Sequence, residues 1–338
     1  MRSVERRALS ALVLGATGFI GGHIARAALE RGWRVRALRR RPNAVGAIGD
    51  IADRIEWVQG ELPFQTFEVP KDLEGLRDAM RGCDVVFHAA AAYPRAERDV
   101  AGWVSCSVTQ MRAALQAASD ARVSRFVYTS TLTTVGPPGE PGRLADERDL
   151  YAPGSARSAY YESKFAMERE AFRAAAEGLP VVILNPTAVF GPGDIKPTTG
   201  EVLLRVAKRQ IPVYFDAAVN SVDVRDVAAA HVTAAERGRV GQRYILGGHN
   251  LTLQELLTTT AQVAGVPPPR WKLSTQMVNR VIRVSDALHL PLPDLVKTLR
   301  LWQPLNSEKA QRELLLSPRP FKNTAHDTIA WFRENHYV

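Results

Sequence analysis

The sequence predicts an α/β fold, with a doubly wound parallel sheet followed by a smaller, mostly helical lobe. Short β-rich runs alternate with helix-compatible runs from about residue 8 to residue 189, which is typical of βαβ units. The first β run leads through a glycine-rich turn directly into a helical run. Because parallel strands are joined by right-handed crossovers, such units place ligands at the carboxyl ends of the strands.

Six β runs are expected to build the sheet, and each precedes a helix-compatible stretch or a loop leading to one: ALVLG, RVRAL, IEWVQ, DVVFHA, RFVYTS and PVVILNP. From Gly191 onward the residue pattern changes: the loop GPGDIKPTTG is followed by a helix and a few strands that return to the first domain. A capping box from Thr252 to Glu255 opens a further helix. We therefore expect one domain over residues 1–190 with returning segments at about 218–250, and a substrate-binding lobe over 191–217 and 251–338.

Composition and charge indicate an ordinary globular chain. It has 338 residues, of which 46% are hydrophobic, enough for a large core. No apolar run reaches the roughly 18 residues of a membrane span. The net charge of +9 is interspersed with acidic residues, which favours an arginine-rich solvated surface over a nucleic-acid interface.

The cysteine content indicates the compartment. Cys83 and Cys106 are too few for a disulfide framework and lack metal-ligand spacing. The N-terminal arginines and the apolar stretch after them imitate a secretion signal, but that stretch runs straight into the glycine turn. We expect a cytoplasmic protein without a metal site.

The glycine turn predicts a dinucleotide site. The string LVLGATGFIGGHIARAAL places Gly15, Gly18 and Gly21 at GxxGxxG spacing between a strand and a helix. Glycines permit the tight turn and the close approach of a pyrophosphate, and the start of the helix offers free N–H groups. The first domain is therefore expected to be an NAD(P)-binding Rossmann domain.

The end of the second β run favours NADP over NAD. NAD-selective folds usually carry Asp or Glu there to hold the ribose 2′-hydroxyl. This chain has Arg39, Arg40 and Arg41, and guanidinium groups pair with a 2′-phosphate through charge-assisted hydrogen bonds. Arg41 could equally be a solvated surface residue.

The stretch SAYYESKF is a candidate proton-transfer motif. Tyr160 lies four residues and Tyr161 three residues before Lys164, and both spacings bring side chains together on a helix. A phenol beside an ammonium can exchange protons with a substrate oxygen. The spacing itself prefers Tyr160 only slightly.

Several motifs in combination give the chain a family resemblance. They are GATGFIG at residues 15–21, VVFHAAA at 85–91, FVYTSTLTTVG at 126–136, YYESK at 160–164 and ILNPTAVFGPGD at 183–194. With them the chain resembles the extended short-chain dehydrogenase/reductases of the NAD-dependent epimerase/dehydratase superfamily. It looks most like the dihydroflavonol-4-reductase-like and hopanoid-associated sugar epimerase-like group, and the resemblance covers nearly the whole chain.

This resemblance implies the catalytic residues Thr131, Tyr160 and Lys164. Lys164 would lower the pKa of Tyr160 and hold the nicotinamide ribose, Tyr160 would exchange the proton, and Thr131 would hydrogen-bond the substrate oxygen. Ser130 could take the place of Thr131. The residues expected to bind the cofactor are Gly15, Thr17, Gly18, Phe19, Ile20, Gly21, Arg39, Arg40, Glu61, Leu62, Ala89, Ala90, Ala91, Thr129, Tyr160, Lys164, Asn185, Pro186 and Thr187.

Other positions are less decisive. The expected substrate-lining residues are Tyr93, Thr133, Tyr161 and Val189, together with the GPGDIKPTTG loop, although packing or hinge roles would also explain them. His88 and His231 lie in apolar segments and are expected to be satisfied core or cofactor-adjacent residues. Asp226 is expected to be structural. The asparagine of the family's NVxGT segment is replaced by Ser107, which changes the proton relay expected of the family.

The remaining residues favour a reductase. Sugar dehydratases carry acidic residues just after the hydroxyl partner, where this chain has Leu132 and Thr133. Many nucleotide-sugar epimerases place an arginine seven residues before Asp226 to bind the diphosphate, and here that residue is Val219. We expect an NADP-dependent reductase of a small ketone or aldehyde. The alternatives are a nucleotide-sugar 4-epimerase with bound NAD and a non-catalytic NAD(P)-binding regulator. A homodimer through the helices starting near Val104 and Ser158 would fit the family.

Overall fold

The computed structural model describes residues 7–63, 68–69, 73–90, 99–156, 158–287, 299 and 301–338. Within them, seven parallel strands form the central sheet in the order β10-β6-β5-β4-β1-β2-β3. The chain leaves β3 on one side of β1 and continues at β4 on the other. This reversal is the switch point at which doubly wound sheets bind their ligands. The predicted α/β fold is confirmed.

The six predicted β runs all form strands of this sheet. They are β1 (Ser10–Leu14), β2 (Arg34–Arg39), β3 (Ile55–Gln59), β4 (Val85–His88), β5 (Arg125–Thr129) and β6 (Val181–Pro186), and β10 (Arg243–Leu246) adds the seventh. Every residue of the inner strands β1, β4 and β6 is buried, as is every residue of the edge strand β10. Their Val, Ile and Leu content follows from this two-sided burial.

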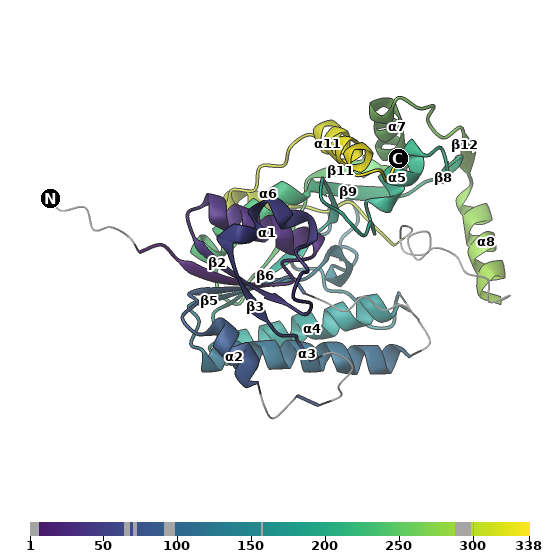
Figure 1. The fold of residues 1–338 in the computed structure, drawn as a ribbon. Helices are drawn as coiled ribbons and strands as arrows, with labels where there is room; N and C mark the ends of the chain where they lie inside the picture. The colour runs from purple at the N-terminus through teal and green to yellow at the C-terminus, as the bar shows by residue number, and fades with distance from the viewer. Residues whose placement is uncertain are drawn as a thin grey trace.

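Helices cover the two faces of the sheet (Figure 1). α1 (Phe19–Glu30) and α6 (Val224–Arg237) lie on one face, with the 3₁₀ segment η1 (Gly46–Arg54) beside α1. α2 (Glu74–Met80), α3 (Val100–Asp120) and α4 (Ala159–Ala176) lie on the other. α3 begins at Val100, four residues before the expected start near Val104. A short 3₁₀ turn, η2 (Leu132–Thr134), follows β5.

The second lobe is built on two small sheets. One has the order β11-β9-β7, from β11 (His249–Thr252), β9 (Ala218–Asp223) and β7 (Ala188–Phe190), and the other pairs β12 (Trp271–Leu273) with β8 (Val213–Phe215). Its helices are α5 (Glu201–Ala207), α7 (Leu253–Ala264), α8 (Thr275–Ala287) and α11 (Phe321–Glu334), while α10 (Glu308–Leu314) packs on α6 and β10. The predicted capping box of Thr252 and Glu255 opens α7. No helix of the described residues is long and apolar enough to cross a bilayer.

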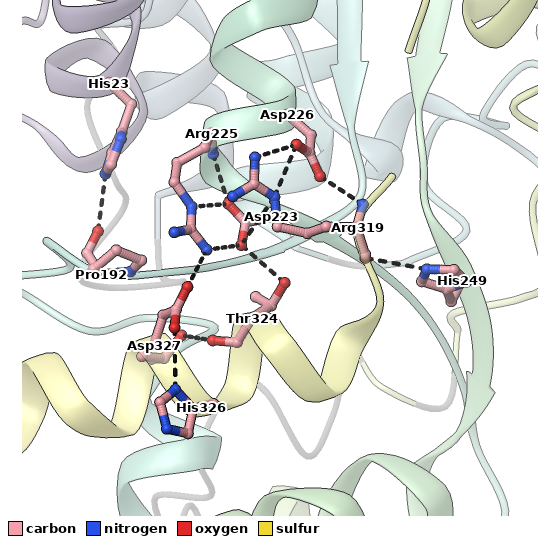
Figure 2. A network of polar contacts seen from close by, with 11 residues as sticks. His23, Pro192, Asp223, Arg225, Asp226, His249, Arg319, Thr324, His326 and Asp327 are labelled. Carbon is pink, nitrogen blue, oxygen red and sulfur yellow. Dashed lines mark hydrogen bonds and ion pairs between the residues drawn. The ribbon is translucent and has the colours of Figure 1, made fainter. Parts of the chain in front are cut away.

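A buried carboxylate joins the end of β9 to the C-terminal helix (Figure 2). Asp223 is fully enclosed and accepts hydrogen bonds from Arg225 at 2.8 and 2.9 Å and from the Thr324 hydroxyl of α11 at 2.8 Å. Arg225 also pairs with Asp327 of α11 at 2.7 Å. Burial alone would raise the pKa of Asp223, but these hydrogen bonds and the charge of Arg225 lower it.

Asp226, in the first turn of α6, has the structural role expected of it. It accepts hydrogen bonds from the backbone N–H of Arg319 at 2.9 Å and from that residue's guanidinium at 2.7 and 2.9 Å. This fixes the segment that leads into α11 against α6 (Figure 2).

Replacement of Asp223 by Asn should lower the free energy of unfolding at pH 7 by about 2 to 3 kcal/mol, because the buried amide cannot accept the charge-assisted bonds. The pKa of Asp223 is lowered on folding, so its contribution is present at pH 7 and is lost as the pH falls below 4. The difference between wild type and variant should shrink over that range in urea titrations. Asp216→Asn, which breaks an exposed pair with Lys272, is the control and should change stability little. Equal effects of the two variants would contradict the role of Asp223.

Candidate active site

The glycine turn between β1 and α1 has space for backbone only. Gly15 has a φ of +94°, and a Cβ there would lie 2.8 Å from the backbone nitrogen of Ala90. A Cβ on Gly21 would lie 2.1 Å from the carbonyl oxygen of Gly15. The turn thus passes against the end of β4 and leaves the first N–H groups of α1 at the switch point. This arrangement fits the pyrophosphate of a dinucleotide.

The other predicted cofactor residues lie around the same edge of the sheet. Thr17, Phe19 and Ile20 belong to the turn and the first turn of α1. Ala89 and Ala90 directly follow β4, while Ala91 lies outside the described residues. Glu61 and Leu62 follow β3, with Glu61 exposed and Leu62 buried against the sheet. Because all these strands are parallel, their carboxyl ends meet here.

A cation is fixed at the end of β2. The guanidinium carbon of Arg39 lies 4.9 Å from the centre of the Trp57 ring on the neighbouring strand β3. Arg40 follows it and is exposed. The cation–π contact holds the Arg39 guanidinium near the position where a Rossmann fold receives the adenosine ribose. A 2′-phosphate at this position would meet positive charge.

Lys164 lies in the second turn of α4 and is buried. Its Nζ donates a hydrogen bond to the carbonyl oxygen of Thr129 at 3.2 Å and lies 5.5 Å from the centre of the Tyr128 ring. Burial lowers the pKa of Lys164 to about 8, and the nearby carboxylate of Glu168 partly opposes this. The ammonium is therefore mostly protonated at pH 7 and loses its proton at a lower pH than an exposed lysine does.

The two tyrosines of α4 have different surroundings. Tyr161 is buried, and its ring packs on that of Tyr151 with the centroids 5.6 Å apart. Tyr160 is only partly buried, and its ring lies edge-on to that of Tyr161 with the centroids 6.5 Å apart. Tyr160 is thus the more exposed of the two tyrosines, and its role in proton transfer stays a prediction.

The hydroxyls of Ser130 and Thr131 also differ. Ser130 donates a short hydrogen bond to the buried carboxylate of Glu168. Thr131 caps η2, and its oxygen accepts a long 3.4 Å contact from the N–H of Thr133. Thr131 donates no hydrogen bond among the described residues, so of these two hydroxyls only that of Thr131 is not used by Glu168.

A buried ion pair between Glu168 and Arg243 lies behind the segment that contains Ser130 and Thr131. We did not predict this pair from the sequence. Glu168 and Arg243 are 2% and 3% exposed, and Arg243 donates to Glu168 Oε1 at 2.8 Å. Glu168 Oε2 accepts from Ser130, from the Thr134 hydroxyl at 2.7 Å and from Asn185 Nδ2 at 2.7 Å. Glu168 lies one helical turn after Lys164. A charged residue on the buried side of α4 was the only sequence signal for this role.

Arg243 uses its remaining donors on backbone carbonyls, and Asn185 Nδ2 also donates to the Thr134 hydroxyl at 2.8 Å. Arg243 donates to the carbonyls of Thr134, Glu147 and Asp149. Asn185 Nδ2 also lies 3.2 Å from the carbonyl oxygen of Thr131. The side chain of Asn185, a predicted cofactor residue, is fully enclosed and positions the backbone of Thr131 from inside the protein.

The two buried histidines are neutral. His231 Nδ1 donates to the carbonyl oxygen of Val227 at 2.8 Å, its Nε2 accepts from the Thr129 hydroxyl at 2.9 Å, and burial lowers its pKa to about 4. It is the satisfied core histidine that we expected. His88 packs edge-on against Tyr128, and burial lowers its pKa to about 3. Neither ring nitrogen of His88 has a hydrogen-bond partner among the described residues, so His88 is not a satisfied core residue, and its expected position next to the cofactor stays a prediction.

The candidate substrate residues are mostly buried, and their role in lining a site stays a prediction. Tyr93 lies outside the described residues, whereas Thr133, Tyr161 and Val189 are buried. The loop GPGDIKPTTG is tied to α1, because His23 Nε2 lies 2.9 Å from the carbonyl oxygen of Pro192 (Figure 2).

The loop therefore adjoins the first helix of the cofactor domain, and the backbone after β7 links both lobes. Pro186 and Thr187 lie at the end of β6, and the Thr187 hydroxyl donates to the carbonyl oxygen of Leu246. Ser107 is buried within α3, which packs along α4.

Comparison with known proteins identifies the family. The sequence profile of the "NAD dependent epimerase/dehydratase family" matches residues 11–247. The chain belongs to this family. The resemblance to the extended short-chain dehydrogenase/reductases is thereby confirmed.

Relatives of the chain include both reductases and epimerases. It is 35% identical to a provisionally named dihydroflavonol 4-reductase of Synechocystis sp., over 96% of this chain and 95% of that protein. It is 30% identical to sterol demethylase protein B of Methylococcus capsulatus, over 96% and 99% of the two chains. A crystal structure of a nucleoside-diphosphate-sugar epimerase from Pseudomonas aeruginosa superposes with a TM-score of 0.83 at 28% identity, covering 98% and 100% of the two chains.

Replacement of Lys164 by Met should stabilise the cofactor-free protein at pH 7 by about 1 to 3 kcal/mol, because it removes a buried ammonium group. The pKa of Lys164 is lowered on folding, so the unfolded chain binds the proton more tightly and the buried ammonium lowers stability below pH 8. This penalty disappears as the pH rises from about 8 towards 10.5.

Denaturant unfolding at pH 7 and pH 10 measures both effects. Lys322→Met on the exposed side of α11 serves as the control. A Lys164→Met variant that is less stable than wild type at pH 7, or whose stability difference is the same at both pH values, would contradict the assignment.

Proposed function

We propose that the chain is an NADP-dependent oxidoreductase that reduces a ketone or aldehyde on a small molecule. The observation that carries this proposal is Arg39, held over Trp57 at the end of β2 with Arg40 next to it. A reductase consumes the NADPH pool, whereas an epimerase recycles one bound NAD. A site that attracts a 2′-phosphate therefore favours net reduction.

In such a reduction each residue of the site has a separate role. NADPH supplies the hydride when bound. Thr131 donates a hydrogen bond to the carbonyl oxygen, and Tyr160 delivers the proton to the same oxygen as it becomes an alcohol. Lys164, held by the carbonyl of Thr129, stabilises the Tyr160 phenolate that remains. Glu168 holds the hydroxyls of Ser130 and Thr134 on either side of Thr131, and Asn185 holds the carbonyl of Thr131.

Nucleotide-sugar 4-epimerisation is the second candidate, because the Pseudomonas aeruginosa structure of similar fold carries that name. Position 219 argues against it. Val219 is 1% exposed in the core of the second lobe, paired with Leu251, and offers no cation to a diphosphate. The names of the relatives from Synechocystis and Methylococcus support a reaction on a less polar compound. Cys83 and Cys106 are free thiols, which fits the reducing cytoplasm in which NADPH is plentiful.

The purified protein should bind NADPH more tightly than NADH, and Arg39→Gln should remove most of that preference. We expect a loss of NADPH affinity of roughly 10- to 100-fold with NADH affinity changed by less than about threefold, because only the bonds to the 2′-phosphate are lost. Calorimetric titration of both nucleotides measures this. Arg41→Gln, one residue beyond Arg40, is the matched control and should have a smaller effect.

If the chain were an epimerase, it would be expected to bind NAD tightly and NADPH weakly. A protein that copurifies with tightly bound NAD, identified by mass spectrometry, and that has no affinity for NADPH would contradict the proposed function.

A further inference from the structure

The region of β12 and α8 carries an unusual concentration of exposed apolar side chains. Trp271 is 63% exposed, Met277 53%, Val281 47% and Val284 48%. Three arginines, Arg270, Arg280 and Arg283, are exposed among them. These seven residues are called the α8 surface below.

The helix α8 has two apolar stripes. Val278 and Ile282 are 5% and 4% exposed and face the protein. Met277, Val281 and Val284 recur at intervals of four and three residues and form a second stripe on solvent. The buried stripe of Val278 and Ile282 is sufficient to pack α8 on its own domain, so packing does not explain the second, exposed stripe. In Figure 1, α8 stands at the edge of the molecule, apart from α5, α7 and α11.

None of the three arginines of the α8 surface makes an ion pair with another residue whose side chain the structure describes, whereas Lys272 between them pairs with Asp216 at 2.8 Å. Elsewhere many arginines have a carboxylate partner, such as Arg205 with Glu201 at 2.6 Å. The α8 surface therefore combines exposed arginines with apolar area on a chain whose net charge is +9.

We propose that the α8 surface docks on an anionic lipid bilayer. Met277, Val281 and Val284 would enter the boundary between headgroups and acyl chains, and Trp271 would sit at headgroup depth. Arg280 and Arg283 can extend their guanidinium groups to lipid phosphates while their methylene stems cover apolar surface. An anionic bilayer therefore offers both an apolar layer for the apolar side chains and phosphate groups for the arginines.

Other partners fit less well. A second copy on a two-fold axis would place the same patch against itself and bring arginine against arginine. A nucleic acid would pair with the arginines but would leave the apolar stripe in water. The inference does not depend on the reaction that the site performs.

Co-sedimentation of the full-length protein with lipid vesicles tests the proposal. Vesicles of phosphatidylcholine and phosphatidylglycerol in equal parts should retain the protein, and vesicles of phosphatidylcholine alone should not. The double variant Arg280→Gln, Arg283→Gln should lower the partition coefficient by roughly 25-fold, since each arginine near an anionic surface contributes about a fivefold factor. The triple variant Met277→Gln, Val281→Gln, Val284→Gln should lower it at least as much. High salt should release the wild type.

The matched control is the double variant Arg122→Gln, Arg237→Gln. It removes the same charge from two exposed positions of the first domain and should bind the vesicles like the wild type. Failure of the wild type to bind the anionic vesicles, equal loss in the control, or equal binding to phosphatidylcholine alone would overturn the proposal. A wild-type dimer that light scattering shows to be monomeric in the triple variant would also overturn it, because the surface would then be a subunit interface.

Discussion

The candidate active site depends on the ion pair between Glu168 and Arg243 inside the core. Transfer of a carboxylate and a guanidinium out of water costs several kcal/mol for each, and their attraction offsets this only when the other lone pairs and N–H groups are satisfied. Here Ser130, Thr134 and Asn185 complete the carboxylate, and three backbone carbonyls complete the guanidinium. The pair thereby joins α4, the end of β5, β6 and β10 in one geometry. A shift of any of these elements would leave a buried charge incompletely bonded.

This constraint explains how the chain separates similar side chains into different roles. Ser130 and Thr131 are adjacent hydroxyls, but only Ser130 is used by Glu168. The same carboxylate lies one turn from Lys164 and favours its ammonium form, while burial disfavours it. The balance leaves the pKa of Lys164 at about 8, where a cation can still stabilise a phenolate and yet lies close to its own titration. Scaffold and proton chemistry are thus linked through Glu168.

The sequence predicts local features well and long-range polar contacts poorly. Strands such as ALVLG follow from continuous apolar runs, and the turn at Gly15 follows from the backbone approach that only glycine permits. The pairing of Glu168 with Arg243 joins residues 75 positions apart, and no local pattern reports it. The same holds for the cation–π contact of Arg39 with Trp57 and for the unsatisfied ring of His88. From the sequence, the positive net charge is interpreted as a solvated surface. The structure places two of these arginines, Arg280 and Arg283, beside an exposed apolar stripe, where we propose a binding surface.

Transfer of deuterium from NADPH labelled at C4 of the nicotinamide tests the central claim most directly. Wild-type protein is incubated with this cofactor and a panel of small ketones and aldehydes, and the products are analysed by mass spectrometry. We predict deuterium on the carbinol carbon of a released alcohol. Tyr160→Phe should lower the rate by roughly 10²- to 10⁴-fold without weakening NADPH binding, and Tyr161→Phe should lower it by less than about tenfold. Binding of NADPH without deuterium transfer to any carbonyl, or equal losses in the two variants, would contradict the account.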